Sequence, residues 1–325
     1  KSWKSSQFVE KLPLNIARFI QTAKTNNLYP EDMKKRISNG GWSSEQISFV
    51  KIANTIYEAY QRKLDDESKI DFSDMINKAV QFLKEEKKLY KNEYDHILVD
   101  EYQDISPQRY ELIKELMIKN PNCKLFCVGD DWQSIMGFSG SNLNYFINFN
   151  TYFHLGDNAR TDLTKNYRSI KTIVDVGACI IKNNKGGQIE KKTISNSNYS
   201  KPLRLYSVHE KAYENKYNEK VAEHFMKKIK EYHEKGYAYD DFLVLMRITS
   251  EKKTIWRYIK EWSDQLNIPI NPESHISKPN CVRFMSVHKS KGLQAKIVII
   301  LNLEKGKYGF PCELENPDIF EPAIR

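Results

Sequence analysis

Two carboxylates that end a short apolar run are the residues of this sequence best suited to chemistry. The run Ile97-Leu98-Val99 leads directly into Asp100 and Glu101, and a run of this kind predicts a buried parallel strand. Ligands of open α/β folds bind at the carboxyl edge of such strands. One carboxylate there can hold Mg²⁺, and the other can take a proton from an attacking water. The alternative is a strand that ends in a solvated acidic turn.

A second polar segment follows another predicted strand, at residues 124–129. Gly129 permits a tight turn, and Gln133 offers both a donor and an acceptor at the same sheet edge. Phe138 stands in a polar, glycine-rich setting and could stack on a nucleic-acid base. Ordinary core packing is the alternative for this aromatic side chain.

The elements that must position these residues change in kind at residue 96. Residues 8–90 have helical periodicity, with Ser44 and Ser73 as predicted N-caps, and a further helix is expected after Ser106 and Pro107. From residue 96 onward predicted strands and helices alternate, which indicates parallel βαβ layers. Strands are predicted at 96–100, 124–129, 151–155, 203–208, 242–246, 282–287 and 297–302, and helices at 170–183, 214–235 and 251–266.

Composition excludes some classes of protein and favours others. The 325 residues are 40% hydrophobic with a mean hydropathy of −0.65, and no window approaches the ~18 apolar residues of a membrane span. Five irregularly spaced cysteines favour a reducing compartment, so we expect a cytoplasmic protein with no membrane partner. The net charge of +9 favours a polyanionic partner. The basic stretch 182–235 could follow a DNA backbone, although interleaved glutamates allow a solvated helix face instead.

Four ordered blocks between residues 96 and 311 resemble the motifs of UvrD/Rep-like superfamily-one DNA helicases, and within them the helicase IV branch. The blocks are VDEYQD with VGDDWQSIMGFSG (motifs II and III), Leu163–Ser169 (motif IV), Ser286–Gln294 (motif V), and Glu304 with Gly309-Phe310-Pro311. Asp71-Phe72-Ser73-Asp74 is similar to a short signature that precedes motif II.

The resemblance implies a role for each matching residue. Asp100 would hold Mg²⁺, Glu101 would activate water, and Gln133 would sense the γ-phosphate of ATP and couple it to DNA. Arg168 would reach the γ-phosphate as a planar cation suited to the developing charge, with a surface arginine as the alternative. Gln294 stands where a glutamate often contacts the ribose.

The resemblance also implies residues that contact DNA. Phe138 would stack on single-stranded DNA, and Met136 occupies a position that is often tyrosine, which puts that contact in doubt. Ser286, His288 and Lys291 would face the DNA backbone. Gly292 would open a helix N-terminus suited to phosphate.

The fold implied is α/β, with two RecA-like parallel-sheet motor domains, the first incomplete, and an N-terminal helical insertion. We expect the insertion over 1–72, the rest of the first motor domain over 73–158, and the second over 159–325. The implied function is an ATP-dependent DNA helicase, with ATP and Mg²⁺ as cofactors. It would travel 3′ to 5′ on single-stranded DNA and unwind duplex DNA, as in DNA repair.

Two departures from the family pattern affect this expectation. No G-x-x-x-x-G-K-[ST] loop occurs in the sequence, and the chain ends before a motif VI. We therefore expect an internal fragment of a motor that by itself hydrolyses little or no ATP. Two alternatives stay open, namely a non-catalytic DNA-binding subunit and the motor part of a helicase–nuclease.

Overall fold

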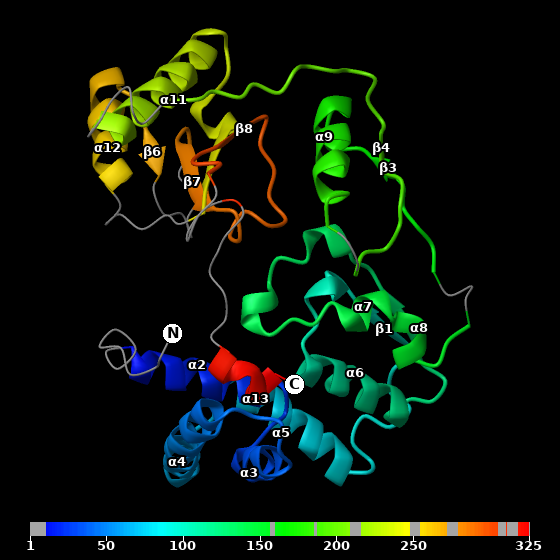
Figure 1. Ribbon diagram of the computed structural model, residues 1–325. Helices are drawn as coiled ribbons and strands as arrows, with labels where there is room; N and C mark the ends of the chain where they lie inside the picture. Colours follow the sequence, from blue (N-terminus) through cyan, green and yellow to red (C-terminus); the bar gives the residue numbers. More distant parts are fainter. Residues whose placement is uncertain are drawn as a thin grey trace. The chain divides into compact units, whose positions relative to one another are not determined.

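The computed structural model describes residues 11–156, 160–184, 187–208, 216–247, 254–271, 279–304, 310 and 318–324. The chain divides into two compact units, the first comprising Lys1–Leu203 with Asn316–Arg325 and the second Arg204–Glu315. Figure 1 shows the elements of each unit. The domain bounds expected at residues 72 and 158 stay predictions.

The amino-terminal part of unit 1 is helical, as its periodicity predicts, and a short helix from the other end of the chain packs with it (Figure 1). The helices are α2 (Leu12–Thr25), α3 (Pro30–Ser38), α4 (Ser44–Asp66), α5 (Phe72–Glu85) and α13 (Glu321–Ile324). Ser43 and Asp71 are the N-caps of α4 and α5, and their side chains accept backbone N–H groups. The caps predicted at Ser44 and Ser73 are therefore wrong by one and two residues.

Aromatic side chains fill the core of this helical part. The Phe19 and Phe49 rings meet edge to face with centroids 5.4 Å apart, and Phe320 lies 6.3 Å from Phe19. All three side chains are buried. Because Phe320 immediately precedes α13, residues from both ends of the chain share one core.

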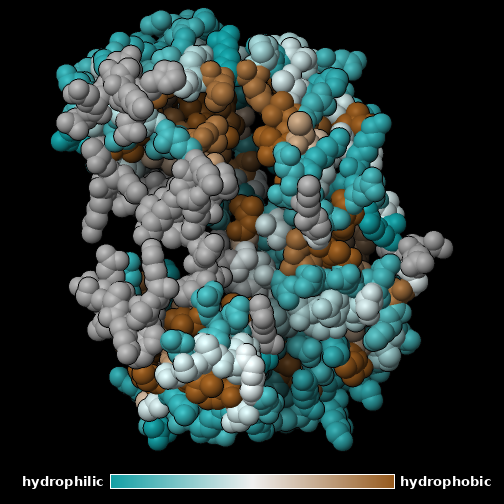
Figure 2. Space-filling view, viewed as in Figure 1, coloured by the Kyte–Doolittle hydropathy of each residue, from teal (hydrophilic) through white to brown (hydrophobic). Residues whose placement is uncertain are grey.

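A two-stranded parallel sheet follows, with a helical crossover between its strands. Its elements are β1 (His96–Val99), α6 (Pro107–Lys119) and β2 (Lys124–Cys127), with Ile97 paired to Leu125 in register. Both strands and the helix were predicted from the sequence. Apolar residues reach the surface at several places on the face drawn in Figure 2. Leu98 and Phe126, partners in this sheet, are 72% and 62% exposed.

The strand predicted at 151–155 is not formed. Two short helices, α7 (Asn144–Ile147) and α8 (Phe149–Tyr152), precede or enter this segment, so that Thr151 and Tyr152 end α8 and a turn follows. Phe149 and Phe153 pack on Tyr102, and Tyr145 stacks on Tyr110 with ring centroids 4.5 Å apart. This aromatic packing partly buries one face of the helical turns, so tertiary packing overrides the strand propensity of the segment.

Unit 1 also contains a short parallel pair, β3 (Lys165–Asn166) with β4 (Ile194–Ser195), and the helix α9 (Lys171–Ile181) between them. The predicted helix at 170–183 is therefore confirmed. The predicted strand at 203–208 is not, because those residues have no strand conformation and Leu205 is 83% exposed.

Unit 2 is a four-stranded parallel sheet covered by two helices (Figure 1). The strand order is β6-β7-β5-β8. The elements are α11 (Tyr217–Glu234), β5 (Phe242–Met246), α12 (Thr254–Leu266), β6 (Ile270–Asn271), β7 (Val282–Ser286) and β8 (Ile297–Ile300). Trp256, Ile259 and Phe284 are central to its core. The α/β class with parallel sheets is confirmed in both units.

The lysines of α11 pair with glutamates of the same helix. Lys220 and Lys227 both bond Glu223, and Lys228 and Lys235 both bond Glu231, at spacings of three and four residues. These pairs are typical of a solvated helix face. Within the described part of the chain, no helix has the length and apolar character needed to cross a bilayer.

Candidate nucleotide and DNA site

The candidate site of unit 1 forms where β1 and β2 end. The Val128 N–H donates to Val99 O (2.8 Å), and the Tyr102 N–H donates to Val128 O (2.9 Å), so the two segments stay in register beyond the strands. Asp100 and Glu101 follow β1 and are exposed. Parallel pairing therefore puts both carboxylates at the carboxyl edge, as predicted.

The backbone at this edge has an unusual conformation. Glu101 has a φ of +51°, in the left-handed region, which costs roughly 1–2 kcal/mol for a residue with a Cβ. Its N–H is held by Asp100 Oδ1 at 2.8 Å. Such backbone strain clusters at functional sites, where it fixes the direction of a side chain.

A buried amide lies directly behind the carboxylates. Gln103 is fully buried, and its Nε2 donates to Glu101 Oε2 at 2.6 Å. Its Oε1 accepts the Asp130 N–H at 2.9 Å. The turn that begins at Asp130 is thereby linked to Glu101.

The second polar segment forms a 3₁₀ turn from Asp131 to Gln133. The Asp130 carboxylate accepts the Trp132 N–H (3.1 Å) and the Gln133 Nε2–H (2.8 Å). Gln133 is exposed, and its amide is oriented by Asp130. The structure thus brings Asp100, Glu101 and Gln133 together on one sheet edge.

A lysine distant in sequence binds the two aspartates of this turn. Lys191 Nζ donates to Asp130 and Asp131, and it lies 4.8 Å from the centroid of the Trp132 ring. Burial raises the pKa of Asp130, but the hydrogen bonds from Lys191 and Gln133 outweigh that effect and the pKa is lowered. The Asp130 carboxylate therefore stays ionised and able to accept these hydrogen bonds.

Arg168 belongs to a loop that starts at β3. Asn166 Oδ1 accepts the backbone N–H groups of Arg168 (3.0 Å) and Ser169 (2.9 Å), and Ser195 Oγ donates to Ser169 O. The Arg168 side chain is exposed. These contacts fix the loop backbone and leave the guanidinium at the surface of unit 1.

The predicted aromatic contact cannot be placed. Phe138 is in a 3₁₀ turn, Gly137–Ser139, but its side chain lies outside the described residues. Met136 is half-buried, and its carbonyl oxygen accepts from Ser139 Oγ at 2.7 Å.

In unit 2, the predicted DNA-contacting residues share the turn between β7 and β8. Ser286 ends β7 and its Oγ accepts the Lys289 N–H at 3.3 Å. Burial and the positive charge of Arg247 lower the pKa of His288, so the imidazole favours its neutral form. Lys291 is half-buried, while Gln294 is exposed and its carbonyl oxygen accepts from Arg283 at 3.2 Å.

The helix expected to begin at Gly292 is not formed. Residues 287–292 are turns, and the next regular element is β8 at Ile297. Gly292 has a φ of +78°, a conformation that glycine adopts readily and that cannot start a right-handed helix. A helix dipole therefore does not supply an anion site at this position.

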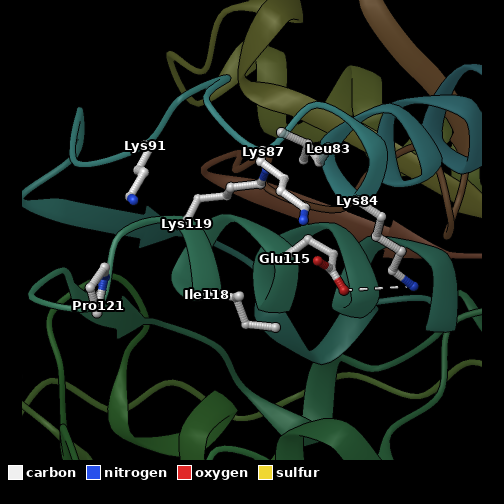
Figure 3. A pocket seen from close by; sticks show the side chains of 8 residues that line it. All are labelled: Leu83, Lys84, Lys87, Lys91, Glu115, Ile118, Lys119 and Pro121. Atoms are coloured by element: carbon white, nitrogen blue, oxygen red, sulfur yellow. Dashed lines mark ion pairs between the residues drawn. The ribbon is translucent and has the colours of Figure 1, made fainter.

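A cavity of about 350 Å³ lies at the other end of the β1–β2 sheet (Figure 3). Its lining comprises Leu83, Lys84, Lys87, Lys91, Glu115, Ile118, Lys119 and Pro121. Lys84 pairs with Glu115 at 3.6 Å, and Lys119 Nζ donates to Glu86 O at 2.7 Å. Lys91 and Pro121 precede the strands, so the cavity is at the amino edge and apart from the candidate site.

The donor set at the carboxyl edge fits a divalent cation held largely by water and phosphate. Asp100 offers an exposed carboxylate, and oxygen ligands of this kind suit Mg²⁺. No cluster of three or more histidine, cysteine or acidic side chains with metal-binding geometry occurs in the ranges that the structure describes. One protein carboxylate with substrate phosphates is a usual arrangement for Mg²⁺.

Two models of known protein families match this chain and show the family to which it belongs. Residues 1–154 match the UvrD/REP helicase N-terminal domain, and residues 161–271 match the UvrD-like helicase C-terminal domain. The chain belongs to the UvrD/REP-like helicase family. The resemblance predicted from the motifs is confirmed, and the parallel α/β units are consistent with RecA-like motor domains.

Curated relatives of this chain are named as helicases. DNA helicase IV of Escherichia coli (strain K12) is 32% identical over 282 residues, which are 85% of this chain and 35% of that protein. The putative ATP-dependent DNA helicase YjcD of Bacillus subtilis (strain 168) is 32% identical over 212 residues, 64% of this chain and 26% of the relative. The ATP-dependent DNA helicase PcrA of Leuconostoc citreum is 29% identical over 253 residues, which are 75% of this chain and 30% of that protein. The chain thus spans about a third of the length of these relatives.

Two residues of this candidate site were not singled out from the sequence. Gln103 stands two residues after Glu101, and an amide so near a carboxylate pair was a usable signal, but its burial was not visible. Lys191 is one lysine among many in the basic stretch 182–235. Only the folded chain shows that it contacts Asp130 and Asp131.

Proposed function

We propose that these residues are part of the motor of an ATP-dependent DNA helicase, which moves 3′ to 5′ along single-stranded DNA and unwinds duplex DNA. The observation that carries the proposal is the gathering of Asp100, Glu101 and Gln133 at one carboxyl sheet edge. This is the edge at which open α/β folds bind nucleotides. Relatives named as ATP-dependent DNA helicases support the same reading.

In the proposed mechanism, Asp100 binds Mg²⁺ and Glu101 accepts the proton of the attacking water. The metal, when bound, neutralises charge on the phosphates. Gln133, held by Asp130, donates a hydrogen bond toward the γ-phosphate, and Arg168 stabilises charge that develops on the transferring group. Gln294 contributes a hydrogen bond to the ribose.

DNA contact is assigned in this proposal to two segments. Met136 and Phe138 lie on the segment after Gln133, and Ser286, His288 and Lys291 of the β7–β8 turn would face the DNA backbone. A neutral imidazole and a lysine suit phosphate contact through hydrogen bonding and charge, respectively. Cycles of nucleotide binding and hydrolysis would alter these contacts and move the motor.

The test uses the full-length product of the gene that encodes this segment. We expect ATP turnover stimulated by single-stranded DNA, and about a 100-fold or greater loss in Glu101→Gln, because a general base contributes roughly that much. Glu85→Gln, an exposed carboxylate outside the site, is the control. Full turnover in Glu101→Gln would overturn the assignment. DNA binding with no turnover in the wild type would favour the non-catalytic subunit instead.

Two further measurements address the remaining parts of the proposal. Unwinding of duplexes with 3′ or 5′ single-stranded tails measures the direction of movement. Unwinding of the 5′-tailed duplex alone would contradict movement from 3′ to 5′. Sequencing the coding DNA on both sides of this segment shows whether G-x-x-x-x-G-K-[ST] occurs in the same reading frame. Since these 325 residues lack that loop, we expect them alone to turn over little or no ATP.

A further inference from the structure

Gln103 lies between two parts of the candidate site and contacts both. Its side chain is fully buried, and its amide makes a contact at each end. The Nε2 group donates to Glu101 Oε2 at 2.6 Å, and Oε1 accepts the Asp130 N–H at 2.9 Å. One planar amide therefore joins the proposed water-activating carboxylate to the turn that carries Gln133.

The orientation of the amide is determined by its surroundings. A backbone N–H can only donate, so the group that faces Asp130 must be the oxygen of Gln103. The NH₂ group is then directed at Glu101, whose carboxylate accepts. A flipped amide would put its oxygen against the carboxylate and its NH₂ against the N–H, which loses both bonds.

The position of the side chain is determined equally tightly. A Cβ built on Gly129 would come within 2.5 Å of Gln103 Oε1 and 3.1 Å of the Gln103 backbone nitrogen. Only glycine leaves room for this approach. The Tyr102 N–H bond to Val128 O holds the preceding residue against the same strand end.

The link continues from Asp130 to the residue that would meet the phosphate. The Asp130 carboxylate accepts the Gln133 Nε2–H at 2.8 Å and is held by Lys191. A displacement of the Asp130 backbone would therefore shift the Gln133 side chain. Positions of Glu101 and Gln133 become interdependent because Gln103 bridges them.

We propose that Gln103 is a positioning residue for the reaction, which aims the Glu101 carboxylate and sets its register against the turn of Gln133. This inference rests on the proposed ATP hydrolysis. Gln103 is buried and acts through Glu101 and Asp130, without meeting the nucleotide. Its effect arises because a catalytic base displaced by about 1 Å can lose on the order of 100-fold in rate.

The first test needs no nucleotide and is made on the 325-residue chain by NMR. Glu101→Gln replaces the charged acceptor of the Gln103 NH₂ group, so we expect the side-chain NH₂ resonances of Gln103 to shift clearly. Glu85→Gln is the control and should leave them in place. Unchanged resonances in Glu101→Gln would overturn the proposal, and this readout does not depend on the stability of any Gln103 variant.

The second test separates the two ends of the amide. Gln103→Glu keeps an acceptor for the Asp130 N–H but removes the donor to Glu101, whereas Gln103→Leu removes both. We expect hydrogen exchange at the Asp130 amide to stay slow in Gln103→Glu and to accelerate in Gln103→Leu. Gln108→Leu, a second buried glutamine in unit 1, is the matched control. Equal exchange in all of these variants would contradict the bridge.

The third test measures turnover of the full-length gene product. We expect Gln103→Glu to lower kcat for ATP by about 100-fold and to leave the KM for ATP within about twofold, since no contact with ATP is removed. If Glu101→Gln abolishes turnover and Gln103→Glu does not, the positioning role is refuted while the proposed function stands. If Glu101→Gln has no effect, the proposed function itself fails.

Discussion

Lys24 is a lysine buried among the helices of unit 1, with a side chain only 1% exposed. Its ammonium group bonds Asp71 Oδ2 and Asp74 Oδ2, each at 2.7 Å, and lies 5.0 Å from the centroid of the Tyr60 ring. Asp74 is fully buried. The carboxylates offset the desolvation of the ammonium group, and the three residues form one interdependent unit.

Replacing Lys24 by methionine should destabilise the fold strongly. Lys24→Met keeps most of the apolar stem but leaves the buried Asp74 carboxylate without its cation, which costs about 3–5 kcal/mol. Urea denaturation measures the change in the free energy of unfolding. Lys34→Met, which removes the exposed pairs with Glu31 and Glu58, is the control and should cost under about 1 kcal/mol. Equal losses in both variants would contradict the interpretation.

The same cluster predicts a loss of stability in acid. Burial raises the pKa of Asp71, but the hydrogen bonds from Lys24 and from the Asp74 N–H outweigh it, so the folded-state pKa is lowered. A group with a lowered folded pKa contributes stability above its unfolded pKa of about 3.9, and that contribution disappears as the pH falls through the folded value. At pH values below about 4, the denaturation midpoint of the wild type should therefore decrease more steeply with falling pH than the midpoint of Asp71→Asn. Parallel pH profiles would refute this.

At the scale of elements, the start of α4 depends on one hydroxyl. Ser43 Oγ accepts the Gln46 N–H at 3.2 Å, and Gln46 Oε1 accepts the Ser43 N–H at 2.8 Å. Together these form a reciprocal capping box that satisfies two backbone donors. The adjacent Ser44 is already inside the helix, and its Oγ bonds Glu45.

The two serines provide a matched test of the cap. Ser43→Ala should lower the free energy of unfolding by about 0.5–2 kcal/mol, because the Gln46 N–H loses its acceptor. Ser44→Ala should change it by less than about 0.5 kcal/mol, because no capping bond is lost. Thermal or urea unfolding of the two variants measures both changes in the free energy of unfolding. A larger loss in Ser44→Ala would support the cap that the sequence periodicity predicted.

At the scale of the whole molecule, each unit has its own hydrophobic core. Ile259 and Trp256 are buried in unit 2, and Ile20 and Phe19 are buried in the helical part of unit 1. Apolar burial stabilises the elements that contribute to it. Local stability should therefore follow the core to which a residue belongs.

Cavity mutations in the two cores should have separate effects. Ile259→Ala removes methyl groups from a fully buried site and should cost about 2–5 kcal/mol. We expect hydrogen exchange measured by mass spectrometry to accelerate in β5 and β7 while α2 and α4 stay protected. Ile20→Ala should give the reverse pattern. Uniform acceleration across both units in either variant would contradict separate cores.

The local pattern of apolar and polar residues in the sequence determined many strands and helices of this protein and located its candidate site. The runs at 96–99, 124–127, 242–246 and 297–300 form parallel strands as predicted. The burial predicted for such runs holds for 242–246, whereas the other three strands expose alternate residues. The helices at 171–181, 217–234 and 254–266 follow from their periodicity. Motif order determined the family, and strand ends located Asp100, Glu101 and Gln133, since side chains after parallel strands meet at one edge.

Tertiary structure decided what depends on contacts between distant residues. The segment predicted as a strand at 151–155 forms the end of α8 and a turn, because Phe149 and Phe153 pack on Tyr102. No helix begins at Gly292, because its positive φ belongs to a turn. In the folded chain the buried Gln103 side chain accepts the Asp130 N–H, and Lys191 donates to the Asp130 carboxylate. Local periodicity predicts neither contact. Residue types and spacing specify local conformation and the edge where chemistry can occur, whereas hydrogen-bond partners across the fold exist only once the chain has packed.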